Sequence, residues 1–294
     1  MMGAAPAKPG PAVNIRKKFK IPQGRKVRLR EFDPAFTPPG ESKRTARHEI
    51  RRLGKRMDDL QYRLFAESRR SLLICLQGLD ASGKDGVIRH VLGNMNPQSC
   101  RVVGFKQPSA EEASHHFLWR IDRATPARGE VVIFNRSHYE DVLIARVHDL
   151  VPRAVWSRRY GEINRFEKLL VENGTTILKF FLHLSKEEQL KRFGQRLKDP
   201  SRRWKISEAD YGERKYWESY TAAYEEALGR CSTRRAPWYV IPSDHKWFRN
   251  LAISRIIVEA MEGMDMQLPR PRVDLAAIRI KYHQASREAG RGRR

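Results

Sequence analysis

The sequence predicts an α/β protein with a parallel five-stranded sheet sandwiched by helices. Two observations lead to this fold class. Short apolar runs of strand length recur along the chain, and they alternate with segments whose apolar residues keep a helical spacing. Strands that are separated by helices favour parallel pairing, with helices on both faces of the sheet. The 294 residues are also enough to bury a full core, as one large domain or as one domain with an insertion.

The predicted elements follow one another along the chain. Residues 1–40 contain seven prolines, which break any long helix, so we expect an extended basic arm there. Residues 42–70 predict a helix, because their apolar side chains alternate three and four positions apart. Strands are expected at 72–76, 101–105, 131–134, 176–184 and 238–241. Helices are expected at 84–94, 110–122, 139–146, 154–172, 207–228 and 247–261, and a further helix opens with a capping box at Ser185–Glu188.

The first predicted strand leads into a glycine-bounded loop. Gly78, Gly83 and Lys84 fit the phosphate-loop pattern G-x-x-x-x-G-K, which requires a strand before it and a helix after it. Such a loop curls backbone N–H groups around phosphate oxygens, the helix N-terminus adds partial positive charge, and the lysine reaches the transferring group. The alternative is a glycine-rich turn that binds nothing. The expected phosphate-binding residues in the loop are Gly78, Ala81, Ser82, Gly83, Lys84, Asp85 and Gly86.

The loop departs from the common pattern at Asp85, where Ser or Thr usually stands. The hydroxyl ligand for Mg²⁺ is therefore missing from this position. Asp80 or Asp85 would have to take part in holding the metal, so we expect magnesium as the cofactor and these two carboxylates as candidate ligands.

A second polar stretch, residues 135–141, follows the third predicted strand. The carboxyl ends of parallel strands share one edge of the sheet, where open α/β sheets bind ligands, so we expect this stretch beside the phosphate loop. Asn135 can orient a ligand but cannot act as a base, whereas Arg136 can bind a phosphate bidentately. Glu140 and Asp141 are equally suited to binding a metal and to interacting with a helix dipole.

The segment between the fourth and fifth predicted strands is longer than a crossover requires. Residues 186–205 contain eight basic residues against three acidic ones, namely Lys186, Lys191, Arg192, Arg196, Lys198, Arg202, Arg203 and Lys205. Arg192 and Arg196 are four positions apart and therefore share one helix face. In a phosphate-loop kinase a mobile lid belongs here, closing cations over the phosphates and excluding water. A solvated helix face is the alternative. The lid is expected at about residues 186–228.

The formal net charge of +24 is concentrated partly at the two ends of the chain. Residues 1–30 hold nine Lys or Arg and no acidic residue, and residues 279–294 hold six against one Glu. The remaining excess implies an acidic partner such as nucleic acid, anionic lipid or a phosphate-rich substrate. There is no apolar run of about 18 residues to predict a membrane span and no secretory signal, and the three widely spaced cysteines suit a reducing cytoplasm.

Five segments together resemble the polyphosphate kinase 2 family. They are GLDASGKDG at 78–86, FKQPS at 105–109, FLWR at 117–120, NRSHYED at 135–141 and DPSRRWK at 199–205. The resemblance extends from about residue 45 to residue 264. It implies a phosphate-loop kinase fold with a helical lid, and Mg²⁺-dependent phosphoryl transfer between inorganic polyphosphate and the purine nucleotides AMP and ADP, or GMP and GDP.

The resemblance also implies roles for individual residues. Four residues are expected to be catalytic: Asp80, Lys84, Arg136 and Arg196. Three further residues are expected to bind phosphate: Lys106, Arg192 and Lys205. Asn135 and Glu140 are expected to orient the nucleotide. Many relatives have Asp at the position of Asn135, and Asn there resembles the subgroup that acts on both nucleoside monophosphates and diphosphates.

Two other functions remain open from the sequence. One is an ATP-dependent small-molecule kinase that uses the same loop. The other is a nucleic-acid-binding protein, suggested by the basic ends, although its aromatic residues do not alternate with basic ones as stacking platforms. We expect a basic arm at 1–40, a kinase domain at 41–264 and a basic tail at 265–294. We also expect a cytoplasmic homo-oligomer with no specific nucleic-acid or membrane partner.

Overall fold

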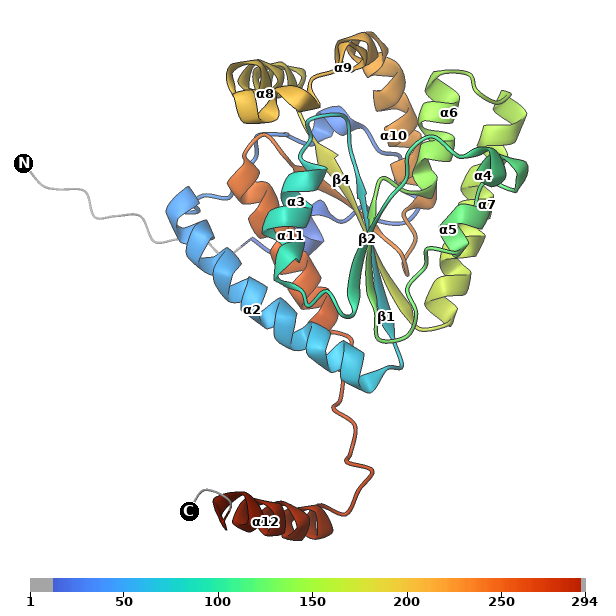
Figure 1. The fold of residues 1–294 in the computed structure, drawn as a ribbon. Coiled ribbons are helices and arrows are strands. Elements are labelled where there is room, and N and C mark those ends of the chain that lie inside the picture. Colours follow the sequence, from blue (N-terminus) through green and yellow to red (C-terminus); the bar gives the residue numbers. More distant parts are fainter. Residues whose placement is uncertain (1–12, 292–294) are drawn as a thin grey trace, which may run out of the picture.

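Five parallel strands form one sheet in the order β2-β3-β1-β4-β5. The structure is a computed structural model that describes residues 13–291, so residues 1–12 of the predicted arm and 292–294 of the predicted tail lie outside the described residues. The strands are β1 (Ser71–Gln77), β2 (Cys100–Gly104), β3 (Val131–Asn135), β4 (Thr175–His183) and β5 (Trp238–Pro242). Helices cover both faces of the sheet (Figure 1), which confirms the predicted fold class.

Both faces of the sheet are buried, which explains the continuous apolar sequence of its central strand. One face packs against α2 (Lys43–Glu67), α3 (Lys84–His90) and α11 (Lys246–Glu262), and the other packs against α7 (Arg153–Glu172) and α10 (Trp217–Cys231). Alternate side chains of β1 enter the two cores, with Leu72, Ile74 and Leu76 on the first face and Leu73 and Cys75 on the second. Each buried leucine contributes about 1.5–3 kcal/mol to folding.

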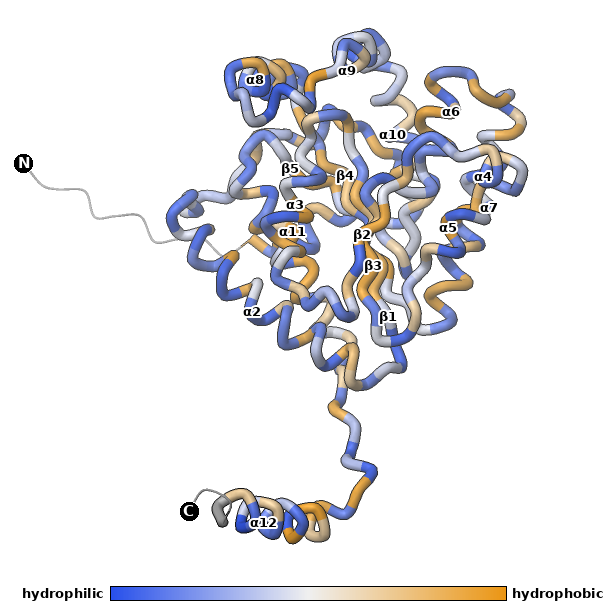
Figure 2. Tube along the Cα trace, in the orientation of Figure 1, coloured by the Kyte–Doolittle hydropathy of each residue, from blue (hydrophilic) through white to orange (hydrophobic). Residues whose placement is uncertain are grey.

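Parallel pairing brings the carboxyl ends of the strands to one edge of the sheet. Leu76 of β1 and Gly104 of β2 both lie opposite Asn135 of β3. The loop after β1 and the polar stretch after β3 therefore begin side by side, as predicted. In Figure 2 the strands form an apolar centre beneath this edge, and hydrophilic segments surround it.

The five strands begin and end within one residue of the predicted positions. The remaining helices are α1 (Ile15–Phe19), η1 (Leu29–Glu31), η2 (Leu92–Asn94), α4 (Ala110–Ser114), α5 (Trp119–Asp122), η3 (His138–Val142), α6 (Ile144–Val147), α8 (Lys186–Lys198), η4 (Pro200–Lys205), α9 (Glu208–Glu213), η5 (Arg214–Tyr216) and α12 (Leu275–Arg291). The predictions for the helices are less accurate than those for the strands.

The predicted helix at 110–122 is wrong, because the chain forms two short helices, α4 and α5. All five side chains of α4 are at least partly exposed, so no packing extends the helix. His115 then adopts an extended backbone (ψ 171°) and its ring stacks on Trp119 with centroids 4.1 Å apart. The predicted helix at 84–94 likewise ends early, at His90, and a single turn of 3₁₀ helix follows.

The predicted continuous helix at 207–228 is also wrong, since it is divided into α9, η5 and α10. At the break, Arg214 donates to the side chain of Gln189 (2.6 Å) and to the carbonyl of Lys186 (3.2 Å), both in α8. These contacts between lid helices decide the local conformation in a segment where α9 buries no side chain fully. At the break, Asp210, Glu213 and Arg214 line a pocket together with Gly78, Leu79 and Asp80 of the loop after β1.

The predicted capping box at Ser185–Glu188 is only half correct. The Ser185 hydroxyl accepts from the Glu188 N–H (3.1 Å), as expected for an N-cap. The reciprocal bond is missing because the Ser185 N–H donates to Asp244 Oδ1 (3.0 Å) and the Glu188 carboxylate binds Arg192 (2.9 Å).

The segment before α2 packs on the sheet domain. Residues 13–40 contain only the short helices α1 and η1, as their prolines predict, but Ile15, Phe19 and Ile21 are buried in the core. The Ile21 N–H donates to the carbonyl of Trp238 in β5 (2.8 Å). At the other end of the chain, α12 lies apart from the sheet domain (Figure 1). The predicted boundary between the kinase domain at 41–264 and the tail at 265–294 stays a prediction. Among the described helices, not one is long and apolar enough to cross a membrane.

A fully buried ion pair joins β4 to α7. Lys179 Nζ lies 2.5 Å from Glu167 Oε2 and also donates to Tyr139 Oη (2.9 Å) and to the carbonyl of Cys231 (2.7 Å). Removing one partner leaves the other charge buried and unpaired, so we expect Lys179→Met to lower the free energy of unfolding in urea by about 3–5 kcal/mol. The double variant with Glu167→Gln should recover part of this loss. A double variant as unstable as the single one would contradict the prediction.

Candidate active site

The phosphate-type loop between β1 and α3 is held in a curled shape. Gly83 has φ +105° and Ala81 has φ +61°, values in the left-handed region that favours glycine. Lys84 begins α3, and its Nζ donates back across the loop to the carbonyl of Gly78 (2.7 Å). Burial lowers the pKa of Lys84, and the nearby Asp80 carboxylate opposes this change. A phosphate in the loop would therefore stabilise the charged lysine.

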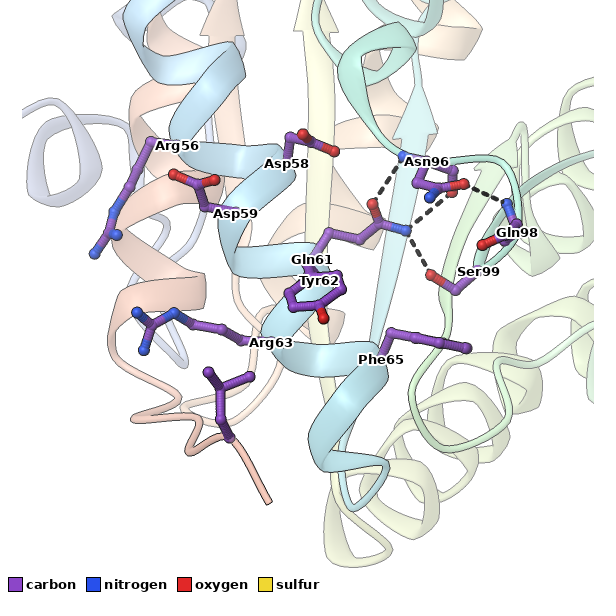
Figure 3. Close-up of a pocket in the computed structure, with 11 residues that line it drawn as sticks. Arg56, Asp58, Asp59, Gln61, Tyr62, Arg63, Phe65, Asn96, Gln98 and Ser99 are labelled. Carbon is purple, nitrogen blue, oxygen red and sulfur yellow. Dashed lines mark hydrogen bonds between the residues drawn. The ribbon is translucent and has the colours of Figure 1, made fainter. Parts of the chain in front are cut away.

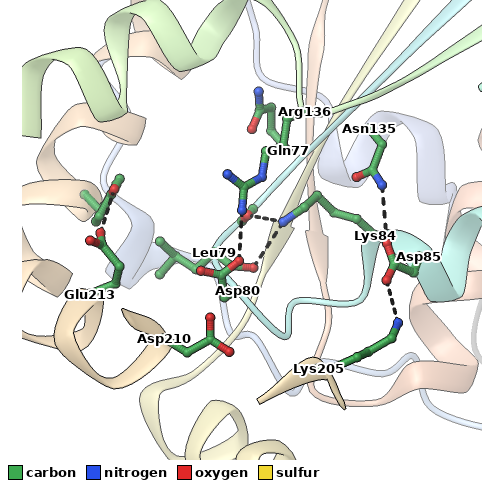
Figure 4. Close-up of polar contacts among 12 residues, drawn as sticks. Gln77, Leu79, Asp80, Lys84, Asp85, Asn135, Arg136, Lys205, Asp210 and Glu213 are labelled. Carbon is green, nitrogen blue, oxygen red and sulfur yellow. Dashed lines mark hydrogen bonds and ion pairs between the residues drawn. The ribbon is translucent and has the colours of Figure 1, made fainter. Parts of the chain in front are cut away.

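The residue after β3, Arg136, reaches the same loop. Its backbone has φ +64°, and its N–H donates to the carbonyl of Leu76 in β1 (3.1 Å). Its Nη2 lies 3.1 Å from Asp80 Oδ1 (Figure 4). Glu140 lines the same pocket as Asp80 and Arg136, and burial raises its pKa although the charges of Arg136 and Lys84 oppose this change. Two carboxylates and two cations from separate strands thus meet at the carboxyl edge of the sheet.

The structure separates the two acidic residues that the sequence left equivalent. Glu140 lines a pocket beside the phosphate loop. Asp141 instead pairs with Arg159 of α7, whose Nη1 lies 3.3 Å from Asp141 Oδ1 and 2.9 Å from its carbonyl oxygen. Of Glu140 and Asp141, Glu140 is therefore the residue that a ligand in the pocket can contact.

The pocket has a volume of about 190 Å³ and lies between the phosphate loop and the lid helices. Its lining includes four carboxylates, two guanidinium groups and three large aromatic rings. One wall is formed by residues of the loop after β1 and of the segment after β3, namely Gly78, Leu79, Asp80, Arg136, Glu140 and Ile144. The other wall is formed by the lid elements α8, α9, η5 and α10, which contribute Gln189, Asp210, Glu213, Arg214, Trp217, Tyr220 and Tyr224. This combination suits a ligand that carries both an aromatic ring and phosphates.

Sequence reasoning missed the lid side of this pocket. Asp210, Glu213 and Arg214 lie where the predicted continuous helix breaks, and they belong to no recognisable motif in the sequence. Gln189 also joins the lid to the loop, since its Nε2 donates to the carbonyl of Asp80 (2.9 Å). A signal was present in the aromatic residues at 217, 220 and 224, whose spacing of three and four places them on one helix face.

Asp85 connects the loop, β3 and the lid. Its carboxylate accepts from Asn135 Nδ2 (3.3 Å) and lies 2.8 Å from Nζ of Lys205 in η4 (Figure 4). The bond from Lys205 is the main reason that the pKa of Asp85 is lowered. Lys205 therefore reaches the phosphate loop, as predicted for a lid residue, but in this arrangement its charge is already matched by Asp85.

The two arginines that share a face of α8 have different surroundings. Arg196 Nη1 lies 3.1 Å from Asp210 Oδ2, so Arg196 approaches the pocket through Asp210. Arg192 is only 5% exposed, and each of its five N–H groups has a partner. These partners are the Glu188 carboxylate and the carbonyls of Ala81, Ser82, Ser243 and Asp244. Arg192 thus contacts the loop's carbonyls and has no N–H left for a phosphate.

Most of the lid cations are paired with carboxylates. In the described chain, six of the eight basic residues at 186–205 form ion pairs, the exceptions being Lys198 and Arg203. Lys106 lies just beyond β2 at the same edge of the sheet and its side chain is exposed. Its carbonyl accepts from Arg120 (2.8 Å), but no contact joins its side chain to the other predicted site residues that the structure describes.

The carboxylates that line the pocket are candidate ligands for a metal ion. Within residues 13–291, no group of three or more His, Cys, Asp or Glu side chains is arranged to hold a metal ion. Asp80 and Glu140 nevertheless line one pocket, and burial and the nearby Asp80 raise the pKa of Asp210 there. Magnesium is commonly bound through one or two carboxylates together with substrate phosphates. These residues therefore fit a divalent cation that binds together with a phosphate ligand.

A family description for polyphosphate kinase 2 matches residues 40–269. The chain belongs to the polyphosphate kinase 2 family. The chain is 46% identical over 266 residues to the AMP/ADP-polyphosphate phosphotransferase of Meiothermus ruber, and the match covers 90% of this chain and 100% of the relative. It is 45% identical over 265 residues to the ADP-polyphosphate phosphotransferase of Rhodopseudomonas palustris, covering 86% of this chain and 92% of the relative.

A solved structure agrees with this assignment. The crystal structure of polyphosphate kinase 2 from Arthrobacter aurescens TC1 matches with a TM-score of 0.89 and 40% sequence identity, and the match covers 96% of this chain and 100% of that chain. The match at this identity supports both the fold and the family of this polyphosphate kinase 2.

A larger groove of about 520 Å³ runs along α2, away from the phosphate loop (Figure 3). Some of its polar groups satisfy one another, since Gln61 Nε2 donates to Ser99 Oγ (2.6 Å) and the Asn96 N–H donates to Gln61 Oε1 (2.8 Å). Its lining includes no predicted site residue of this polyphosphate kinase 2. The candidate active site is therefore chosen by the chemistry of its side chains and not by its volume.

Proposed function

We infer that this protein is a phosphotransferase that moves a phosphoryl group between inorganic polyphosphate and a nucleotide. The observation that carries the inference is the convergence of Lys84, Asp80 and Arg136 on one side of an acidic pocket with aromatic walls. Relatives that are 45–46% identical are named for this reaction. The alternatives, an ATP-dependent small-molecule kinase and a nucleic-acid-binding protein, are not favoured.

The proposed roles follow from charge and position. Phosphoryl transfer depends mainly on positioning and on stabilising the charge that develops on the transferring group. Lys84 and Arg136 would neutralise that charge, and Asp80 would hold Arg136 in place. Polyphosphate would lie along the phosphate loop toward Lys205 and Lys106, and the nucleotide would occupy the pocket lined by Trp217, Tyr220 and Tyr224. Arg196 would act on the phosphates after exchanging Asp210 for a substrate oxygen.

We propose that both AMP and ADP are acceptors, and GMP and GDP likewise. Asn135 supports this proposal, because a neutral amide beside Asp85 adds no negative charge to the loop edge where the donor and acceptor phosphates would meet. An additional phosphate on the acceptor is therefore tolerated. The name of the Meiothermus ruber relative contains both nucleotides, whereas that of the Rhodopseudomonas palustris relative contains ADP.

Phosphoryl transfer in such kinases commonly requires a divalent metal, and we propose Mg²⁺. Asp80 and Glu140 are the carboxylates that would hold it in the pocket. Asp85 would join them only after releasing Lys205. When bound, the ion supplies positive charge that is shared between phosphate oxygens of the donor and the acceptor.

The remaining expectations are proposals as well. We propose a cytoplasmic protein that self-associates and has no specific nucleic-acid or membrane partner, with residues 41–264 as the kinase domain. The cysteines support a reducing compartment, since Cys75, Cys100 and Cys231 are all free. The basic arm and tail would contact polyanions loosely through their excess of charge.

The decisive assay combines polyphosphate and Mg²⁺ with either AMP or ADP and separates the products by chromatography. We expect ADP from AMP and ATP from ADP, with both reactions abolished by a chelator of divalent ions. Product with a single acceptor would keep the enzyme class and remove the dual acceptor proposal. No transfer to either acceptor by a folded sample would contradict the proposed function.

A further inference from the structure

Arg249 lies in α11 and is buried directly beneath the phosphate loop. It is 2% exposed. Its Nη1 donates to the carbonyl of Ser82 (3.2 Å), and its Nε and Nη2 donate to Oδ1 of the adjacent Asn250 (3.1 and 2.8 Å). In the part of the chain that the structure describes, no carboxylate forms an ion pair with it. A buried guanidinium without a carboxylate is costly, so its retention calls for a reason.

The loop is shaped to fit this guanidinium. A Cβ atom added at Gly86 would lie 2.9 Å from Arg249 Nη2, and one added at Gly83 would overlap the guanidinium. The absence of side chains at Gly83 and Gly86 therefore leaves room for Arg249. This requirement is separate from the close approach of a phosphate, which also favours glycine in such loops. The arginine touches the backbone of the loop itself.

A second buried arginine donates hydrogen bonds to the same part of the loop. Arg192 of α8 donates to the carbonyls of Ala81 (2.9 Å) and Ser82 (3.2 Å), so the Ser82 carbonyl accepts from two guanidinium groups. In a trans peptide the carbonyl and the following N–H point in opposite directions. Holding the Ser82 carbonyl toward the arginines therefore turns the Gly83 N–H away from them, toward the side on which such loops bind phosphate.

The two arginines also leave positive charge behind the loop. Glu188 pairs with Arg192, which leaves the charge of Arg249 unmatched. Burial and the neighbouring Arg192 lower the pKa of Arg249, as expected for a cation without a partner. The pKa of Lys246, at the start of α11, is also lowered by burial and by these cations. A phosphate anion in the loop would compensate this charge.

We propose that Arg249 is a positioning residue for phosphate binding: it fixes the Ser82–Gly83 peptide and supplies unmatched positive charge behind the bound phosphate. It contacts the loop and not the substrate. The proposal rests on the proposed function only in requiring that the loop bind phosphate.

The sharpest test is Asn250→Asp. The new carboxylate takes the place of an amide that already accepts two bonds from Arg249, so it matches the charge without changing side-chain shape. We expect an unfolding temperature equal to or above that of the unmodified protein. We expect binding of tripolyphosphate, measured by calorimetry without nucleotide, to weaken about tenfold because the phosphate loses an unmatched cation. Unchanged tripolyphosphate affinity would overturn the charge role of Arg249.

Arg249→Met and Arg255→Met form a matched pair on one helix. Arg255 pairs with Glu41 and Glu49 (both 2.6 Å) and makes no contact with the loop among the described residues. We expect Arg249→Met, and not Arg255→Met, to weaken tripolyphosphate binding by at least about tenfold, whatever change in unfolding temperature each variant shows. Arg249→Lys should recover part of that affinity. Equal affinity in the two methionine variants would overturn the proposal.

These measurements separate the proposal from the proposed function. Should Arg249→Met fail to fold, the Asn250→Asp result still decides the charge role. Failure of the proposed function would appear as absence of polyphosphate transfer by the unmodified protein. Failure of the present proposal would appear as normal tripolyphosphate affinity in the variants.

Discussion

Lys84→Met is expected to reduce turnover by about 10³-fold or more, because the variant loses the cation that faces the transferring phosphoryl group. The structure adds an expectation about stability. Lys84 is held against the carbonyl of Gly78, and burial lowers its pKa, so the ammonium destabilises the folded protein in the absence of phosphate. The variant should therefore have an unfolding temperature that is unchanged or higher.

Steady-state rates with polyphosphate and ADP, together with thermal unfolding with and without tripolyphosphate, test this expectation. Lys55→Met is the matched control, because Lys55 is exposed on α2. We expect the control to keep its rate and its stabilisation by tripolyphosphate. A Lys84→Met enzyme that turns over at near the normal rate would remove Lys84 from the mechanism.

Arg136→Ala is expected to lower turnover by a similar factor of about 10³, since one arginine facing a transferring phosphoryl group contributes at least this much in related chemistry. Arg136→Lys keeps the charge but not the planar fork that can bind Asp80 and a phosphate together, so it should recover little of the rate. The loss should be mainly in kcat, because the charge that Arg136 neutralises develops in the transition state.

The backbone of Arg136 allows a clean control for this prediction. Because its φ is +64°, glycine at this position relieves strain, and Arg136→Gly should unfold at a temperature no lower than that of Arg136→Ala. Both variants should have the same low turnover. Combining Asp80→Asn with Arg136→Ala should be far from additive, since Asp80 acts partly through Arg136. Full activity in Arg136→Gly would contradict the assigned role.

The sheet and the phosphate loop could be predicted from sequence because their signals are local. A continuous apolar run precedes the loop that contains Gly78, Gly83 and Lys84. Parallel pairing of β1 with β3 then places Asn135 next to the start of this loop. The roles of the cations could not be predicted in the same way. Arg192 and Arg196 share a helix face, yet one is buried against loop carbonyls and the other pairs with Asp210.

The residues that were missed depend on contacts between distant segments. Asp210 and Glu213 reach the pocket only because α9 ends where Arg214 contacts α8. Arg249 is one of three basic residues in α11, and no spacing rule distinguishes it from the other two. In each case the decisive interaction joins residues that are far apart in the sequence, and this information appears only in the folded chain.

The ion pairs of the lid have a consequence for how substrates compete. Besides the buried Arg192, five of its basic residues already hold a carboxylate, so a phosphate that binds to one of them must replace an acidic side chain, as in an ion exchanger. Binding then releases fewer solution ions than eight bare cations would, and the affinity falls less steeply with salt. A single phosphate competes with tethered carboxylates one at a time, whereas linked phosphates displace several together at high effective concentration. We therefore expect the affinity for polyphosphate to rise with the length of the chain.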